Sequence, residues 1–249
     1  MLTRLIGLRG RAVVLALALA ASVSAPTALR AAAVPIPATA VEPDLTERDV
    51  LASNAKVRMA YADLSGMWRA RFGQLGTRFA TPRLVRYRGA TRSTCGIMQP
   101  NNAAYCPTEN TIYYDELFVA AQATTAALEL GTDGDMAGIG VIAHEMGHAA
   151  AIQLGFSSPV AYDNEAVADC FAGAFARHAD ENGSLEPGDV EEAFFGMAAA
   201  ADPTPRLTGN RRVDRRILRR AALMGHGTRE QRMANFRTGL EGGAGACMA

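Results

Sequence analysis

The chain has 249 residues, about half of them apolar, and its formal net charge is zero. This length and composition fit one globular domain with a substantial core behind a processed N-terminus. The balanced charge lacks the clustered lysine and arginine that neutralise phosphates, so we exclude nucleic acid as an expected partner.

Arginines followed by an apolar run predict an export signal over residues 1–25. Arg4, Arg9 and Arg11 precede "AVVLALALAASVSA", which is too short to span a bilayer convincingly. Cleavage is expected near residue 25 or as late as residue 33, and an uncleaved membrane anchor is the alternative. We therefore expect an exported protein, periplasmic or secreted, that contacts a membrane only if this segment is not cleaved.

A flexible leader rich in alanine, proline and valine, residues 26–44, is expected to precede the folded domain, residues 45–249. The domain begins with a helical pattern in which Thr46 and Asp49 form a capping-box pair. We expect one long helix here, or two helices broken near Gly66.

Short β segments and four helices follow in chain order. The stretches "RLVRYRG" and "TIYYD", residues 83–89 and 111–115, predict strands. Helices are expected over residues 115–131, 135–155, 163–178, and from 186 or 189 to 200. The expected fold class is therefore mainly α (α+β), with a small β segment packed on a helix.

Four cysteines are present, Cys95, Cys106, Cys170 and Cys247, and an exported protein reaches a compartment that preserves disulfides. Four cysteines permit three pairings, and spacing alone cannot choose among them. We favour Cys95 with Cys106, closing a short loop, and Cys170 with Cys247, tying the tail to a helix. Buried free thiols are the alternative.

The stretch "GVIAHEMGHAAAIQLG" places His144 and His148 four residues apart, on one face of a helix and about 6 Å from each other. Two imidazoles so arranged can bind one zinc ion, which lowers the pKa of a bound water to about 7. Glu145 can accept the proton of that water as hydroxide attacks a carbonyl. A chance pattern on an amphipathic helix is the alternative, but apolar and small neighbours indicate a buried helix, in which histidines need partners.

Zinc also needs a third protein ligand. The extended motif with a third histidine is excluded, because Ala151 and Leu154 occupy its positions. A later helix supplies Glu165, with Asp169 one turn onward on the same face. We expect Glu165 to be the third ligand and Asp169 to accept the free ring N–H of a ligand histidine, most simply His144. Exchanged roles for the two carboxylates are the alternative.

Two further histidines and two arginines lie outside this motif. His226 is a candidate donor to the oxyanion of the tetrahedral intermediate, or a structural residue where a helix begins. His178 fits a solvated or helix-terminal position. Arg229 and Arg232 follow His226 on an expected helix, and we expect surface salt bridges for both. The arginine-rich segment 206–225 is expected to be a solvated helix or to contact acidic partners.

An ordered series of segments resembles the neutral zinc metallopeptidases of bacteria. The segments are "STCG", "YCPTENTIYYDELF", "VIAHEMGHAAAIQLG", "NEAVADCFAGAFARH", "GSLEPGDVEEA", "HGTREQR" and "CMA". The resemblance runs from about Trp68 to the C-terminus and implies a zincin-like fold, with the four cysteines at family positions. It also implies three zinc ligands and a catalytic base: His144, His148 and Glu165, with Glu145. One departure concerns residues 149–151, which are small here and commonly bulkier or polar in the family.

These expectations combine into an exported zinc-dependent endopeptidase that hydrolyses peptide bonds through a zinc-activated water. Its expected partner is a peptide or protein substrate, which could pair alongside the "TIYYD" strand. The alternative is a latent or noncatalytic zinc-binding envelope protein with a chaperone-like or binding role, for example with His226 closing the site as a fourth ligand.

Overall fold

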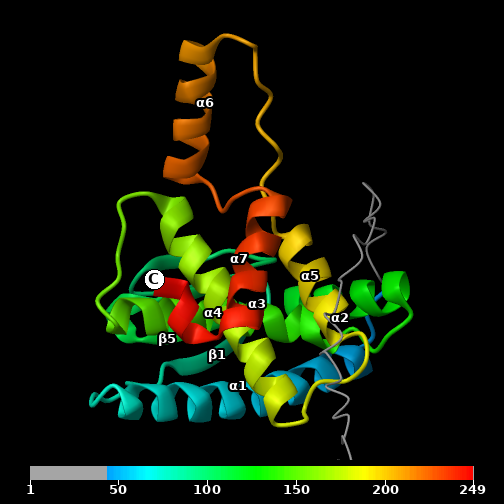
Figure 1. The fold of residues 1–249 in the computed structure, drawn as a ribbon. Coiled ribbons are helices and arrows are strands. Elements are labelled where there is room, and N and C mark those ends of the chain that lie inside the picture. Colours follow the sequence, from blue (N-terminus) through cyan, green and yellow to red (C-terminus); the bar gives the residue numbers. More distant parts are fainter. Residues whose placement is uncertain (1–43, 249) are drawn as a thin grey trace, which may run out of the picture. The chain divides into compact units, whose positions relative to one another are not determined.

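The computed structural model describes residues 44–248. The expected signal peptide, and all of the expected leader except residue 44, lie outside the described residues. Helices dominate residues 44–248 and the strands are short (Figure 1), which confirms the expected mainly α fold class. Within this range no helix has both the length and the apolar character that crossing a bilayer requires.

The chain order interleaves one long helix, five short strands and six further helices. The helices are α1 (Glu47–Gln74), α2 (Glu116–Leu130), α3 (Asp135–Gln153), α4 (Ala161–Glu181), α5 (Asp189–Ala199), α6 (Arg211–Met224) and α7 (Arg229–Gly242). The strands are β1 (Arg83–Tyr87), β2 (Thr91–Ser93), β3 (Gly96–Met98), β4 (Ala103–Cys106) and β5 (Thr111–Asp115). Two short 3-10 turns, Pro107–Glu109 and Ala244–Met248, complete the described elements.

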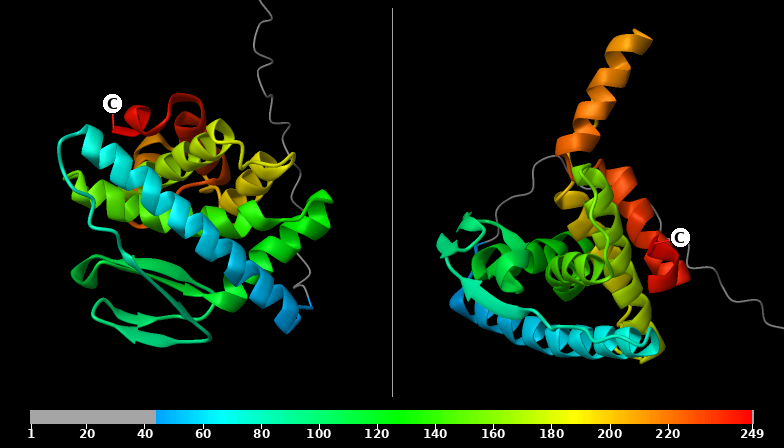
Figure 2. Two further views of the ribbon diagram at one scale, coloured as in Figure 1. Left: turned by 90° about the horizontal axis from the view of Figure 1, so that it is seen from below. Right: turned by 90° about the vertical axis from the view of Figure 1, so that its left-hand side faces the viewer.

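The first helix, α1, is one continuous element. Its N-terminus carries the predicted capping box, because the Thr46 side chain accepts from Asp49 N–H while the Asp49 carboxylate accepts from Thr46 N–H. Gly66 lies inside the helix without breaking it. The buried face of α1 includes Leu64 and Trp68, and the helix crosses the others on one side (Figure 2).

The main sheet has the strand order β1-β5-β4, with β1 parallel and β4 antiparallel to β5. All five residues of β5 are buried. Strands β2 and β3 form a separate antiparallel pair. The expectation that a substrate pairs alongside "TIYYD" is wrong, because β1 and β4 occupy both edges of β5. The free edges of this sheet belong to β1 and β4.

Helix α3, which carries the two histidines, is the most enclosed of the described helices. It packs against α1, α2, α4, α5 and the strand β4. Gly147 lies within the histidine motif, where a Cβ atom would approach the Ala168 carbonyl oxygen of α4 to 2.8 Å. Glycine at this position therefore lets α4 pass directly beside the two histidines.

Two disulfides fix the loop before β5 and the C-terminal tail. Cys95 pairs with Cys106, and Cys170 of α4 pairs with Cys247, as the favoured pairing expects. Helix α7 packs along α4, and a Cβ atom on Gly239 would collide with the Cys170 backbone. This close contact and the second disulfide hold α4, α7 and the tail together.

Candidate metal centre

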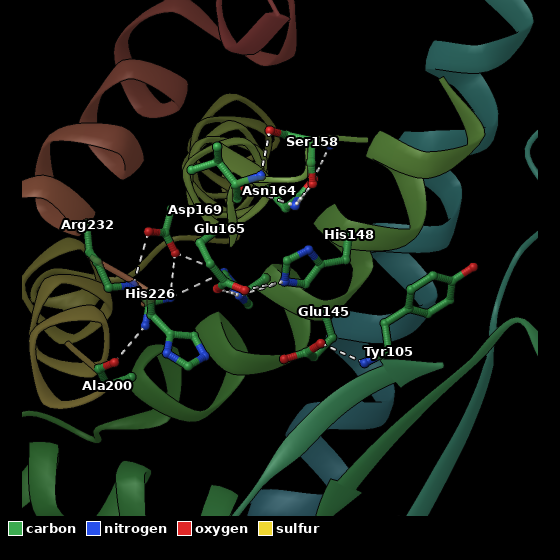
Figure 3. A network of polar contacts seen from close by, with 12 residues as sticks. Tyr105, Glu145, His148, Ser158, Asn164, Glu165, Asp169, Ala200, His226 and Arg232 are labelled. Atoms are coloured by element: carbon green, nitrogen blue, oxygen red, sulfur yellow. Dashed lines mark hydrogen bonds and ion pairs between the residues drawn. The ribbon is translucent and has the colours of Figure 1, made fainter. Parts of the chain in front are cut away.

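Three side chains from α3 and α4 converge on one point. His144 Nε2 lies 3.1 Å from His148 Nε2 and 3.1 Å from Glu165 Oε2, and His148 Nε2 lies 3.5 Å from Glu165 Oε1. The α4 helix is held in place before Glu165 by Asn164, whose side chain bonds the Ser158 backbone in both directions (Figure 3). The helical spacing of α3 and the turn into α4 thus bring together the three ligands expected from the sequence.

The separations within this triangle fit a zinc ion. Zinc binds nitrogen and carboxylate oxygen at about 2.0–2.1 Å, so two ligand atoms of a tetrahedral site lie about 3.3 Å apart. Glu165 Oε2 is also buried and has no hydrogen-bond partner, although it lies 3.1 Å from His144 Nε2. A buried carboxylate oxygen without a donor is unfavourable in an apolar surrounding, and a cation at the centre of the triangle would satisfy it.

The two carboxylates of α4 take different places around His144. Glu165 approaches Nε2, the atom that also faces His148, whereas Asp169 Oδ1 lies 2.9 Å from Nδ1 on the other side of the ring. Glu165 belongs to the group of three possible ligands, and Asp169 does not. This geometry favours Glu165 as ligand and Asp169 as acceptor of the ring N–H, rather than the exchanged assignment.

Burial and the neighbouring charges both shift the pKa values of the three side chains in the triangle. Burial would lower the pKa of His144, but the neighbouring Asp169 and Glu165 carboxylates raise that pKa to about 10. Burial and the neighbouring His144 lower the pKa of His148 to about 4, which keeps this ring in the neutral form that binds metals. Burial would raise the pKa of Glu165, but His144 lowers it to about 2. The carboxylates therefore favour a positive charge at His144 Nε2, which a proton or a metal ion can supply.

Glu145 points away from the triangle toward the sheet (Figure 3). Its Oε2 accepts a hydrogen bond of 2.7 Å from the Tyr105 N–H of β4. Burial raises the pKa of the Glu145 carboxyl group, an effect that nearby His144 partly opposes. A buried carboxylate with a raised pKa is a stronger proton acceptor than an exposed one.

Arg232 of α7 lies inside the protein beside the triangle, and the expectation of a surface position was wrong. We expected a surface salt bridge, but Arg232 is only 3% exposed. Its guanidinium group bonds both Asp169 oxygens, at 2.6 and 3.1 Å, and donates to the Ala200 carbonyl oxygen at 2.9 Å. A bidentate arginine holds a carboxylate in a fixed orientation, so Arg232 positions the oxygen that faces His144.

A cavity of about 650 Å³ opens in front of these residues. Its wall includes strand β4 and the loop before it. It also includes the side chains of Glu145, His148 and Glu165, and Arg232 of α7. His226 lines this cavity from its rim, with a side chain that is 60% exposed and lies 3.8 Å from the Asp202 carboxylate. Among the described residues, the group of possible ligands contains no fourth member, so His226 does not close it.

His178 lies elsewhere. It occupies the last turn of α4, and its Nε2 is 3.1 Å from Asp63 of α1. This agrees with the helix-terminal position expected from the sequence and takes His178 out of the site.

Residues 13–248 match the family described as "Putative neutral zinc metallopeptidase". The chain belongs to this family. The match includes every residue of the triangle, together with Glu145, Asp169 and Arg232. Membership of a zinc metallopeptidase family agrees with the ligand types, their separations and the open cavity beside them.

Relatives of this metallopeptidase family member include the "Uncharacterized protein YpfJ" of Escherichia coli strain K12 and its counterpart in strain O6:H1 (CFT073). Each is 34% identical over 195 residues, which covers 71% of this chain and 63% of the relative. The aligned part thus spans less than two thirds of either relative. No solved structure matches the chain.

Proposed function

We propose that this chain is an exported zinc-dependent endopeptidase. The observation that carries the proposal is the triangle of His144, His148 and Glu165, which faces an open cavity and has three protein ligands instead of the four usual in structural zinc sites. Bound there, zinc would polarise the peptide carbonyl and lower the pKa of a water molecule to about 7.

Glu145 is the proposed proton acceptor. It lies directly after the first ligand histidine, lines the cavity and has a raised pKa. Rotation of its side chain away from Tyr105 N–H would let it take a proton from the attacking water and return that proton to the leaving amine. His226, at the rim of the same cavity, is the proposed donor to the oxyanion.

The outer edge of β4 is the proposed binding place for the peptide. Asn102 O accepts from Asp115 N–H and therefore faces β5. Because successive residues of a strand alternate, the backbone groups of Ala103 and Tyr105 face the opposite way, toward the cavity that both residues line. An extended peptide could pair with these groups beside Glu145.

Export is supported by cysteine usage. All four cysteines form disulfides, which persist in oxidising compartments and are rare in the reducing cytosol. Together with the arginines and apolar run of residues 1–25, this favours a periplasmic or secreted enzyme.

The test is hydrolysis of casein by the exported chain and its Glu145→Gln variant, with and without a chelator. We expect chelator-sensitive hydrolysis by the wild type, and a loss of at least about a hundredfold in the variant, because glutamine cannot accept the proton. Zinc content should be unchanged in Glu145→Gln. Glu129→Gln, an exposed carboxylate on α2, is the matched control and should keep wild-type turnover.

Wild-type turnover by Glu145→Gln would refute the base assignment. Zinc binding without any turnover by the wild type would instead indicate the alternative, a latent or noncatalytic zinc-binding envelope protein.

A further inference from the structure

Helix α6 stands away from the other helices (Figures 1 and 2). It lies between Ala200, after the end of α5, and His226, before the start of α7. Its base contacts α4, yet none of residues 211–224 is buried. An element of fourteen residues that adds nothing buried to the core needs another reason for its composition.

The two faces of α6 differ sharply in chemistry. At about 100° per residue, Val213, Ile217, Ala221 and Met224 fall within roughly 80° of the helix circumference. The arginines occupy about half of the circumference on the other side. They are Arg211, Arg212, Arg215, Arg216, Arg219 and Arg220.

The apolar face is exposed. Val213 is 41% exposed and Met224 74%, while Ile217 is half-buried. Leu218, between the stripe and the arginines, is 49% exposed, and Leu223, at 40%, lies among the arginines. A helix of a soluble domain normally turns such a stripe toward its own core. Here three of the four stripe residues are exposed, on an element that projects from the domain (Figures 1 and 2).

The basic face carries uncompensated charge. Six arginines less one aspartate, Asp214, give α6 a charge of +5, whereas the whole chain has none. Asp214 is engaged by Thr208 in the turn before the helix. Between the described side chains, no ion pair involves these six arginines. Guanidinium groups bind phosphate oxygens bidentately, so an anionic phosphate surface matches this face.

We infer that α6 is an interfacial helix that docks the protein on an anionic phospholipid bilayer. A basic face beside an exposed apolar stripe is typical of helices that lie in the plane of the membrane interface. A phospholipid bilayer matches both faces of α6, because headgroup phosphates bind the arginines and acyl chains cover the apolar stripe. A nucleic acid would use the arginines and leave the apolar stripe in water, and an acidic protein would need an apolar groove beside its carboxylates to cover the stripe.

The base of α6 connects this surface to the cavity. Asp202 N–H donates to Gly227 O at 2.9 Å, and Asp202 Oδ2 accepts from Gly227 N–H at 3.0 Å. These two bonds join the chain before α6 to the chain after it. His226, at the rim of the cavity, is the neighbour of Gly227. Docking through α6 would therefore hold the cavity close to the bilayer. The inference does not depend on zinc binding or on turnover.

The test is flotation of the full exported chain with vesicles of phosphatidylcholine alone or of phosphatidylcholine with equimolar phosphatidylglycerol. The triple variant Arg212→Gln, Arg216→Gln, Arg219→Gln weakens the basic face, and Ile217→Ser with Met224→Ser weakens the apolar stripe. The triple variant Arg58→Gln, Arg69→Gln, Arg78→Gln removes the same charge from exposed positions outside α6 and is the matched control. The N-terminal sequence is common to all four proteins, so differences between them belong to the substituted residues.

We expect wild-type and control proteins to float with the anionic vesicles and not with the neutral ones. Each basic residue near an anionic surface contributes about fivefold to partitioning, so the α6 arginine variant should bind on the order of a hundredfold more weakly. The apolar variant should lose roughly tenfold or more. Unfolding temperatures should stay at the wild-type value, because α6 buries no side chain.

Equal binding of all four proteins, or no preference of the wild type for anionic vesicles, would overturn the inference. Loss of binding in the arginine variant without loss in the apolar variant would also overturn it, because charge alone would then be recognised and an acidic macromolecule would be the better partner.

Discussion

Asp169 and Arg232 form a buried pair on which the orientation of His144 depends. Both side chains are almost fully enclosed, and the pair joins α4 to α7 beside the proposed zinc ligands. Burial would raise the pKa of Asp169, but its bonds to His144 and Arg232 lower it. The carboxylate is therefore ionised at neutral pH, and its charge is acceptable inside the protein only while both partners are present.

Removing Arg232 alone should lower the free energy of unfolding more than removing Arg232 together with the Asp169 charge. Arg232→Met leaves the buried Asp169 carboxylate without its arginine partner and should reduce the free energy of unfolding by about 3–5 kcal/mol. Adding Asp169→Asn removes that charge, so the double variant should be more stable than Arg232→Met. Urea unfolding of metal-free protein measures both values.

Arg237→Met is the control for the arginine substitution. Arg237 is exposed on the same helix and lies over the Phe194 ring, so its loss should cost less than about 1 kcal/mol. Strictly additive effects of Asp169→Asn and Arg232→Met would show that the two residues are not energetically coupled.

At the scale of elements, the N-terminus of α3 is fixed by a side chain from another helix. Its N-terminus receives the Glu192 carboxylate of α5, which accepts from Gly134 N–H at 2.9 Å and Met136 N–H at 2.8 Å. Glu192 is fully buried, and burial raises its pKa. This side chain from another helix thus serves as the cap that Gly134 cannot supply for α3.

Glu192→Ala should loosen the start of α3. Two buried N–H groups lose their acceptor, and we expect a loss of about 3 kcal/mol in the free energy of unfolding. Amide exchange at Gly134 and Met136 should accelerate before exchange in the rest of α3. Glu191→Ala, the neighbouring half-buried carboxylate, is the control. Unchanged exchange at both amides in Glu192→Ala would exclude the capping role.

Elements with a local signal could be predicted from the sequence. The capping box of α1 and the glycine stops after α2 and α3 depend on neighbouring residues, and the helices lie close to the expected ranges. Strands β2, β3 and β4 were missed because each has only three or four residues, and β4 is defined by its pairing with β5. The same absence of a local signal led to the wrong expectation that a substrate could pair alongside "TIYYD".

The site residues also divide into those with a local signal in the sequence and those defined by distant contacts. The spacing of His144 and His148 is local and predicted a shared face, and Glu165 and Asp169 lie one turn apart on a single helix. The sequence could not choose between these two carboxylates, because the choice depends on which ring nitrogen each one approaches. Arg232 was placed at the surface because its partner Asp169 is 63 residues away in the sequence.

At the scale of the whole molecule, stability should depend on pH through an acidic cluster near the start of α3. Asp189 lies close to Asp133, Asp135 and Glu192. Lys56 forms ion pairs with Asp133 and Asp135. Burial, with contributions from Asp135 and Glu192, raises the pKa of Asp189 to about 6, although a bond from Glu186 N–H opposes this. The folded state therefore favours protonated Asp189.

The sign of the effect follows from this raised pKa. The stabilising contribution of protonated Asp189 is present below its unfolded pKa, near 4, and is lost as pH rises through about 6. Asp189→Asn, which stays neutral and can still accept from Glu186, should stabilise the protein at pH 7.5 by on the order of 1 kcal/mol and give no gain near pH 4. Urea unfolding of metal-free protein at the two pH values measures the difference. An equal effect at both would contradict the assigned ionisation.

The zinc content of the purified protein tests the central claim most directly. Metal analysis after dialysis against zinc and then metal-free buffer should give one zinc per chain for the wild type and for Glu145→Gln. His148→Ala and Glu165→Ala should hold no zinc, because each removes one of three ligands. Absence of zinc from the wild type, or unchanged zinc in either ligand variant, would contradict the assignment of His144, His148 and Glu165 as the metal site.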